Sequence, residues 1–214
     1  MAFLPAGRVV ILVLDALGPE FVRPERMPWL WRLAERGAMA PLGGLAELVA
    51  STGPCHSTLL TGAPLAGHGV LANRVFAADG GVDRDPRVRV PTVLDRAKAA
   101  GRRTAVASSD PDILNTINGH SADSVWPRAA DIDRHGSPPP KYLPDEDCAA
   151  TLVEMVRAGH ELIVGQLQGV DTAVHAYGID APETRAAHAT VDEAVGALAS
   201  ALADGWEQTL VAIV

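Results

Sequence analysis

The chain has 214 residues, of which 48% are hydrophobic and 4% aromatic, and its formal net charge is −8. This length buries one substantial core, so we expect a single domain over residues 1–214. The sequence contains no run or stripe of Lys and Arg, which argues against a nucleic-acid partner. It begins without a charged segment followed by a long apolar one, and the first apolar run is too short to span a bilayer. We therefore expect a cytoplasmic protein with no membrane partner.

Residues 8–14 form the first predicted strand. They read Arg-Val-Val-Ile-Leu-Val-Leu, a β-branched and leucine run without polar alternation, which is typical of a parallel strand buried on both faces. Asp15 follows directly. Open α/β sheets bind ligands beyond the carboxyl ends of their strands, so Asp15 is a candidate ligand or catalytic residue. An aspartate that only caps the next turn fits the pattern equally well.

The stretch around residue 52 combines hydroxyl side chains with a helix start. A short apolar run at 48–50, expected to be a strand, leads into Ser51 and Thr52, and Gly53-Pro54 turns the chain. A helix then continues to Leu60 and ends at Gly62, because proline suits the first helical turn. Free N–H groups and the helix dipole at this point favour a phosphoryl group, and the Thr52 hydroxyl is a candidate nucleophile. Ordinary helix capping by either hydroxyl is the alternative.

The other elements follow from apolar periodicity and from proline and glycine punctuation. We expect helices at 28–36, 93–100, 145–158 and 182–203, and buried strands at 104–107, 161–167 and 209–214. Asp110 is expected to cap the short helix that follows the strand at 104–107. Residues 117–144 are rich in Asn, Gly, Ser, Asp and Pro, and we expect a loop excursion or lid there. Strands that alternate with helices predict a doubly wound, mainly parallel α/β sheet with helices on both faces.

Asp171 and His175 follow the strand predicted at 161–167. A spacing of four brings a carboxylate and an imidazole onto one cation, either on a helical turn or in a tight loop. An aspartate-capped turn with a surface histidine is the alternative.

Asp15, Thr52 and the Asp171/His175 pair therefore belong to one edge of the predicted sheet. Two carboxylates, an imidazole and a hydroxyl at a helix N-terminus suit metal-assisted phosphoryl transfer. One cation would lower the pKa of the hydroxyl, and a second would neutralise the phosphoryl oxygens. The His/Asp ligand mixture favours zinc, with manganese as the alternative. The expected partner is a small-molecule phosphoester or nucleotide.

Five motifs occur in a characteristic order. They are Val10 to Leu17, Thr-x-Pro-x-His at 52–56, Thr61-Gly62, His68-Gly69-Val70 with Asn73, and Asp171-x-x-x-His175. This set resembles the alkaline phosphatase superfamily, in particular its nucleotide pyrophosphatase/phosphodiesterase branch. The resemblance implies that Thr52 forms a phosphothreonine intermediate and binds one metal together with Asp15. It implies that Asp171 and His175 bind the second metal, and that Asn73 and the Gly53 N–H bind the phosphoryl group.

The sequence also departs from that family. The family's Ser-Asp-His-Gly segment and a further histidine would complete the two metal sites, but the sequence stops at Val214, before either. We therefore expect it to be the amino-terminal portion of the domain. A non-catalytic remnant or interaction protein on the same fold is one alternative. A hydrolase of phosphonates or sulfate esters is another, although the sulfatase signature Cys-x-Pro-x-Arg is absent.

Overall fold

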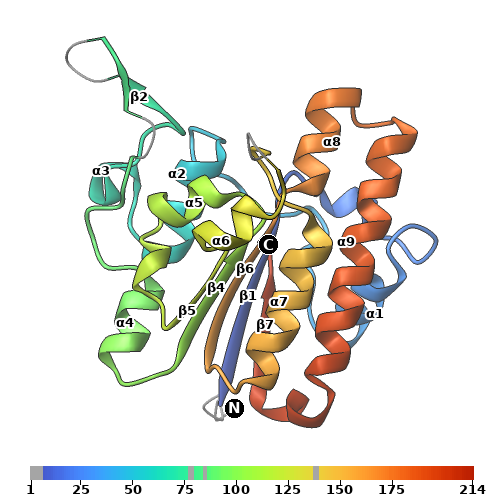
Figure 1. The fold of residues 1–214 in the computed structure, drawn as a ribbon. Helices are drawn as coiled ribbons and strands as arrows, with labels where there is room; N and C mark the ends of the chain where they lie inside the picture. Colours follow the sequence, from blue (N-terminus) through green and yellow to red (C-terminus); the bar gives the residue numbers. More distant parts are fainter. Residues whose placement is uncertain (1–6, 77–79, 84–85, 137–139) are drawn as a thin grey trace.

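The core of the protein is a five-stranded parallel sheet. The computed structural model describes residues 7–76, 80–83, 86–136 and 140–214 (Figure 1). The strand order is β5-β4-β6-β1-β7, and every neighbouring pair is parallel. The strands are β1 (Arg8–Leu14), β4 (Thr104–Ser108), β5 (Ser124–Trp126), β6 (Leu162–Leu167) and β7 (Thr209–Ile213). A short antiparallel hairpin joins β2 (Val75–Phe76) to β3 (Val82–Asp83). The predicted doubly wound, mainly parallel fold is confirmed.

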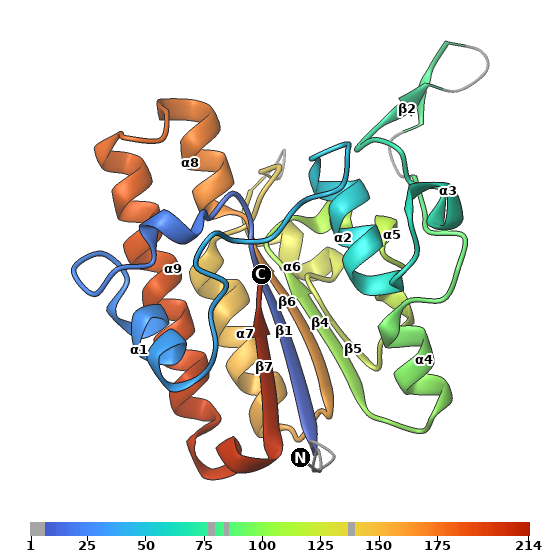
Figure 2. The same ribbon diagram turned by 180° about the vertical axis from the view of Figure 1, so that it is seen from behind.

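Helices cover both faces of this sheet, as the two opposite views show (Figure 1, Figure 2). They are α1 (Pro28–Arg36), α2 (Thr52–Thr61), α3 (Leu65–His68), α4 (Val93–Ala99), α5 (Pro111–Thr116), α6 (Ala129–Asp133), α7 (Asp145–Arg157), α8 (Gly169–Tyr177) and α9 (Pro182–Ala201). Three 3-10 turns accompany them: η1 (Pro19–Phe21), η2 (Gly119–Ser121) and η3 (Ala203–Gln208). None of the helices in the described part of the chain has the length and apolar character that crossing a bilayer requires.

Alternate residues of the strands belong to two separate apolar clusters. Val10, Leu12 and Leu14 of β1 pack with residues of α1, α7, α8 and α9. Val9 and Ile11 pack on the other side with residues of α2, α4 and α5. Successive side chains of a strand point to opposite faces, so a strand that is apolar throughout contributes to both layers. This is the arrangement that the unbroken apolar run of residues 8–14 predicted.

The apolar run at 48–50 is not a strand, which corrects the prediction. Leu48 is 99% exposed, and the segment is irregular. In the described sheet β1 pairs with β6 and with β7, and the segment at 48–50 pairs with none of the described strands. Thr52 is also not ahead of its helix but its first residue, with Ser51 as the N-cap.

Two further expectations need correction. The excursion at 117–144 contributes β5 to the sheet and also contains α6; its residues 137–139 lie outside the described part. β5 has only three residues, Ser-Val-Trp, which is too short for a periodic pattern. β7 is an edge strand with Leu210 57% exposed, whereas its apolar sequence predicted burial on both faces.

The turn from β4 into α5 contains a buried carboxylate. Asp110 is 8% exposed, and its Oδ1 accepts a hydrogen bond from the Asp112 N–H at 3.1 Å. The predicted cap is therefore confirmed. Burial raises the pKa of Asp110 from 3.8 to about 6, against the lowering effect of that hydrogen bond, and the negative charges of Asp112 and Asp15 add to the rise.

The docking of α1 on α9 depends on a carboxylate and a glycine. Asp192 accepts hydrogen bonds from the Trp29 and Leu30 N–H groups at 3.0 and 2.9 Å, which satisfies free donors at the start of α1. Gly196 lies one turn further along α9. A Cβ atom there would lie 2.6 Å from Nε1 of the Trp29 ring, so the glycine makes room for the indole.

Gly196→Ala tests this packing, because its effect on the free energy of unfolding should reverse sign when Trp29 is removed. Alanine improves helix propensity by about 1 kcal/mol, but overpacking against a rigid ring costs about 1–3 kcal/mol. We expect a net loss of about 1 kcal/mol in urea unfolding. In a Trp29→Ala background the same substitution should instead stabilise the protein. Gly44→Ala, where a Cβ would meet nothing within 4 Å, is the control. A loss that persists without Trp29 would contradict this account.

Asp110→Asn tests the raised pKa of the buried carboxylate through the pH dependence of folding stability. Because the folded pKa of Asp110 lies above its unfolded value, wild type loses stability as pH rises from about 4 through about 6, whereas the amide does not titrate. We expect the stability of the variant relative to wild type to increase over this range by up to about 3 kcal/mol. Thermal unfolding in the presence of a chelator measures it, with the exposed Asp204→Asn as control. A difference that stays constant with pH would contradict the prediction.

Candidate active site

Asp15 stands at the carboxyl end of the central strand β1. Its N–H donates to the Leu167 carbonyl at 3.0 Å, so the ends of β1 and β6 are tied together. The next residue, Ala16, has φ +62°. This left-handed conformation is uncommon for a residue other than glycine, and it turns the chain sharply after Asp15. The carboxylate lines a long open cleft at this edge of the sheet.

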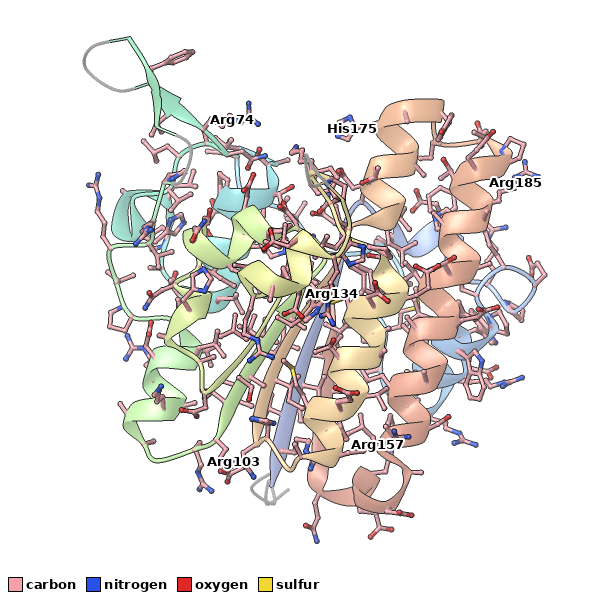
Figure 3. The ribbon with its side chains drawn as sticks, in the orientation of Figure 1. Arg74, Arg103, Arg134, Arg157, His175 and Arg185 are labelled. Carbon is pink, nitrogen blue, oxygen red and sulfur yellow. The ribbon has the colours of Figure 1, made fainter. Side chains whose placement is uncertain are left out.

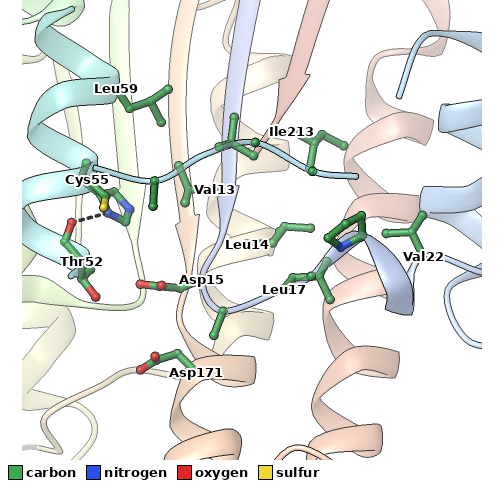
Figure 4. Close-up of a pocket in the computed structure, with 18 of the residues that line it drawn as sticks. Val13, Leu14, Asp15, Leu17, Val22, Thr52, Cys55, Leu59, Asp171 and Ile213 are labelled. Carbon is green, nitrogen blue, oxygen red and sulfur yellow. Dashed lines mark hydrogen bonds between the residues drawn. The ribbon is translucent and has the colours of Figure 1, made fainter. Parts of the chain in front are cut away.

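Thr52 lines the same cleft from the N-terminus of α2 (Figure 4). Ser51 is the N-cap of α2 but makes no side-chain capping bond within the described structure. Ordinary capping therefore does not explain the Ser51 hydroxyl. The Gly53 N–H donates to Oδ1 of Asn73 at 2.7 Å. Asn73 and the Gly53 N–H, which were both predicted to bind a phosphoryl group, are therefore hydrogen-bonded to each other. Gly53 is buried. Asn73 also lines the cleft.

His56 lies one turn after Thr52 and is 5% exposed. Its Nδ1 donates to the Thr52 carbonyl at 2.8 Å, which holds the first turn of α2. Burial lowers the pKa of His56, and the charge of Asp15 opposes this shift. Its Nε2 has no hydrogen-bond partner among the described residues. The sequence motif contains this histidine, but its spacing gave no indication of a buried, unpartnered nitrogen.

Asp171 and His175 lie one turn apart on α8, which selects the helical alternative for this pair. His175 Nε2 is 3.4 Å from Asp171 Oδ1, and the two side chains are 80% and 17% exposed. His175 projects from the outer part of α8 (Figure 3). Burial raises the pKa of Asp171, the charge of Asp15 raises it further, and His175 opposes the rise.

The cleft brings together the side chains that the sequence singled out. Asp15, Thr52, Asn73, Asp171 and His175 all line it. The Asp15 and Asp171 carboxylates point toward the side on which Thr52 lies (Figure 4). Four separate segments supply these residues, namely the end of β1, the start of α2, the loop after α3 and α8, and all of them line this one cleft.

The donors in the cleft fit divalent cations in kind. Carboxylate oxygens and imidazole nitrogens are ordinary ligands of zinc and manganese. The repulsion between Asp15 and Asp171 is of the kind that a bound cation relieves. Within the described residues, however, no group of three or more His, Cys, Asp or Glu side chains is close enough to hold a metal. The pairs Asp15/Thr52 and Asp171/His175 would thus need further ligands.

Two buried glutamines connect the carboxylates, and sequence reasoning missed them. Gln166 and Gln168 are each 2% exposed. The signal was present as two amides that interrupt the apolar end of the strand, Leu-Ile-Val-Gly-Gln-Leu-Gln. Buried amides must find hydrogen-bond partners, so the two glutamines could have been singled out from the sequence, although not the residues that they contact.

Comparison with known proteins places these features in a family. The family model for type I phosphodiesterase / nucleotide pyrophosphatase matches residues 9–214. The alkaline phosphatase PhoK from a Sphingomonas species is 28% identical over a stretch that covers 59% of this chain and 27% of that protein.

Two solved structures share the fold. Phosphonoacetate hydrolase from Sinorhizobium meliloti, in complex with phosphonoformate, is 21% identical with a TM-score of 0.72, covering 92% of this chain and 54% of that one. An inactive threonine-to-alanine variant of murine ectonucleotide pyrophosphatase/phosphodiesterase 5, in complex with AMP, is 17% identical with a TM-score of 0.72, covering 96% and 55%. The chain thus spans about half the length of these structures. Since the family model covers nearly every residue, the chain belongs to the type I phosphodiesterase/nucleotide pyrophosphatase family.

Proposed function

We propose that the protein containing this chain is a metal-dependent hydrolase of phosphoric esters or anhydrides that acts through a phosphothreonine at Thr52. The observation that carries this proposal is the convergence of Thr52, at the start of α2, with Asp15 and Asp171 in one cleft. The inactive threonine-to-alanine variant among the structural neighbours supports a threonine nucleophile.

The chemistry assigned to Thr52 is a displacement at phosphorus. Its Oγ1 forms a bond to phosphorus while the bond from phosphorus to the leaving-group oxygen breaks, and water then cleaves the threonine ester. The N-terminal N–H groups and the dipole of α2 favour the negative phosphoryl group next to this hydroxyl. The Asn73 side chain, whose oxygen accepts from the Gly53 N–H, would donate its amide N–H to a phosphoryl oxygen.

Asp15 and Thr52 would hold one divalent cation, and Asp171 and His175 a second. Zinc is the first candidate from the donor set and manganese the second. Bound cations would supply Lewis-acid polarisation of the phosphoryl group and a lower pKa for the attacking hydroxyl. The chain itself orients the donors: β1 positions Asp15, and one turn of α8 positions Asp171 and His175.

Phosphonate hydrolysis is the second candidate function. The specific observation in its favour is the similarity of the fold to phosphonoacetate hydrolase in complex with phosphonoformate. The AMP complex of the murine neighbour favours nucleotides. Parallel assays with bis(p-nitrophenyl) phosphate, p-nitrophenyl phosphate and phosphonoacetate separate diester, monoester and phosphonate substrates.

Thr52→Ala should lower kcat of the intact protein by at least about 10³-fold, because the nucleophile is removed. Thr52→Ser should retain part of the activity, since serine restores a hydroxyl at the same place. Ser51→Ala is the matched control and should stay within a few-fold of wild type. Hydrolysis of bis(p-nitrophenyl) phosphate gives the readout. Equal activity of wild type and Thr52→Ala would refute the nucleophile, and loss in Ser51→Ala alone would transfer the role to Ser51.

Asp15→Asn and Asp171→Asn should each lower the zinc bound to the intact protein by about one equivalent, because a neutral amide is a much weaker ligand than a carboxylate. Elemental analysis after equilibrium dialysis measures the stoichiometry. The exposed Asp180→Asn substitution, on the turn after α8, is the control. Unchanged zinc in Asp15→Asn would remove that residue from the site. A wild-type protein that binds no zinc or manganese and hydrolyses none of the three substrates would favour the non-catalytic alternative.

A further inference from the structure

A continuous chain of amide hydrogen bonds runs beneath the candidate site from Asp15 to Asp171. Gln166 Nε2 donates to Asp15 Oδ2 at 3.4 Å and to Gln168 Oε1 at 2.5 Å. Gln168 Nε2 in turn donates to Asp171 Oδ2 at 2.5 Å. Both amides are buried, so these bonds are shielded from competition with water.

The donor-to-acceptor direction of these amide hydrogen bonds is fixed at Gln166. Gln166 Oε1 accepts from the Asp110 backbone N–H at 3.2 Å and from Ser108 Oγ at 2.6 Å. A backbone N–H can only donate, so this end of the Gln166 amide is its oxygen and the other end is its NH₂ group. The Gln166 NH₂ group therefore donates to Asp15 and to Gln168 Oε1, and the Gln168 NH₂ group donates to Asp171. Each of the two aspartates receives an N–H at its Oδ2 atom.

The backbone beneath the amides is held independently. The Gln168 N–H donates to Ser109 Oγ at 2.8 Å and to Asp145 Oδ1 at 3.0 Å. The second oxygen of Asp145 accepts from the Gly169 N–H at 2.9 Å. Segments at the ends of β4 and β6 and at the start of α7 therefore fix the place from which the Gln168 side chain extends.

We propose that Gln166 and Gln168 are positioning residues that set the separation and orientation of Asp15 and Asp171, and that they thereby set the spacing of the two cation positions. This inference rests on the proposed function and extends it to residues that do not touch the substrate. The amides hold the Oδ2 atom of each aspartate, and the Oδ1 atom of Asp171 lies toward His175. Hydrogen bonds to the far oxygen orient a ligating carboxylate and commonly change metal affinity by about 10–100-fold.

The chemistry of the amide explains why glutamine stands at both places. Each glutamine must accept at one end and donate at the other, which an amide does and a carboxylate or thioether does not. A glutamate at 168 would lack the N–H for Asp171 and would add a negative charge beside it. A methionine would match the length but leave both aspartates unheld.

We expect substitutions of the two glutamines to affect cation binding differently. Calorimetric titration of the intact protein with zinc measures the affinities. Gln166→Met should weaken both cation positions by about 10-fold or more, because Gln166 contacts Asp15 and also orients Gln168. Gln168→Met should weaken chiefly the position that contains Asp171. Thr184→Val removes an equally buried hydrogen bond, to the Gly178 carbonyl at 2.7 Å, and is the control for loss of stability alone. It should leave both zinc affinities unchanged.

A metal-free crystal structure of Gln166→Met gives a readout that does not depend on activity. We expect the separation between the Asp15 and Asp171 carboxyl carbons to differ from that in wild type. An unchanged separation would overturn the inference, and so would unchanged zinc affinities in a wild type that binds zinc. A wild type that binds no zinc or manganese and hydrolyses none of the three substrates would instead overturn the proposed function, while the crystal structure would still decide the role of the glutamines.

Discussion

The pairing of β1 with β6 is the constraint on which the site depends. In their parallel register Leu14 lies opposite Leu167, so both strands end at the same level and Asp15 emerges beside Gln166 and Gln168. A slip of one residue would turn each side chain to the opposite face of the sheet. The same register places Val10, Leu12 and Leu14 in one apolar cluster and Val9 and Ile11 in the other. The burial that stabilises the sheet therefore also fixes the aspartate at its edge.

The second constraint is the concentration of negative charge at that edge. Burial raises the pKa values of Asp110 and Asp171, and the negative charge of Asp15 raises both further. Lys141 offsets part of this charge at both residues. His175 opposes the rise at Asp171, and amide and backbone N–H groups donate to Asp15, Asp171 and Asp110. Such an edge attracts cations and repels an unaccompanied phosphoryl group, which is why the proposed chemistry requires metal.

The sequence predicted those parts of the fold that depend on local patterns. Long apolar strands such as residues 8–14 and helices bounded by Pro28 and Gly37 were predictable, because burial and backbone conformation leave periodic signals. The exposed run at 48–50 was mistaken for a strand, because local composition does not tell whether a segment will pair with a neighbouring strand. β5 was missed for the opposite reason: its three residues become a strand through pairing with β4. Thr52, Asp15 and Asp171 were singled out from the sequence as candidates, whereas the hydrogen bonds of the glutamines required the tertiary structure.

The candidate nucleophile and the candidate ligands are held by different layers of the molecule. α2 packs in the apolar cluster on one face of the sheet through Leu60, and α8 packs in the cluster on the other face through Val170. No strand leads into Thr52 in the described structure, so its position depends on α2 itself, on the His56 bond to its carbonyl and on the Asn73 bond to Gly53. Asp15, at the end of the strand between the two layers, is the common reference. The sheet thus acts as a rigid spacer between hydroxyl and carboxylates, and the glutamines extend that rigidity from Asp15 to Asp171.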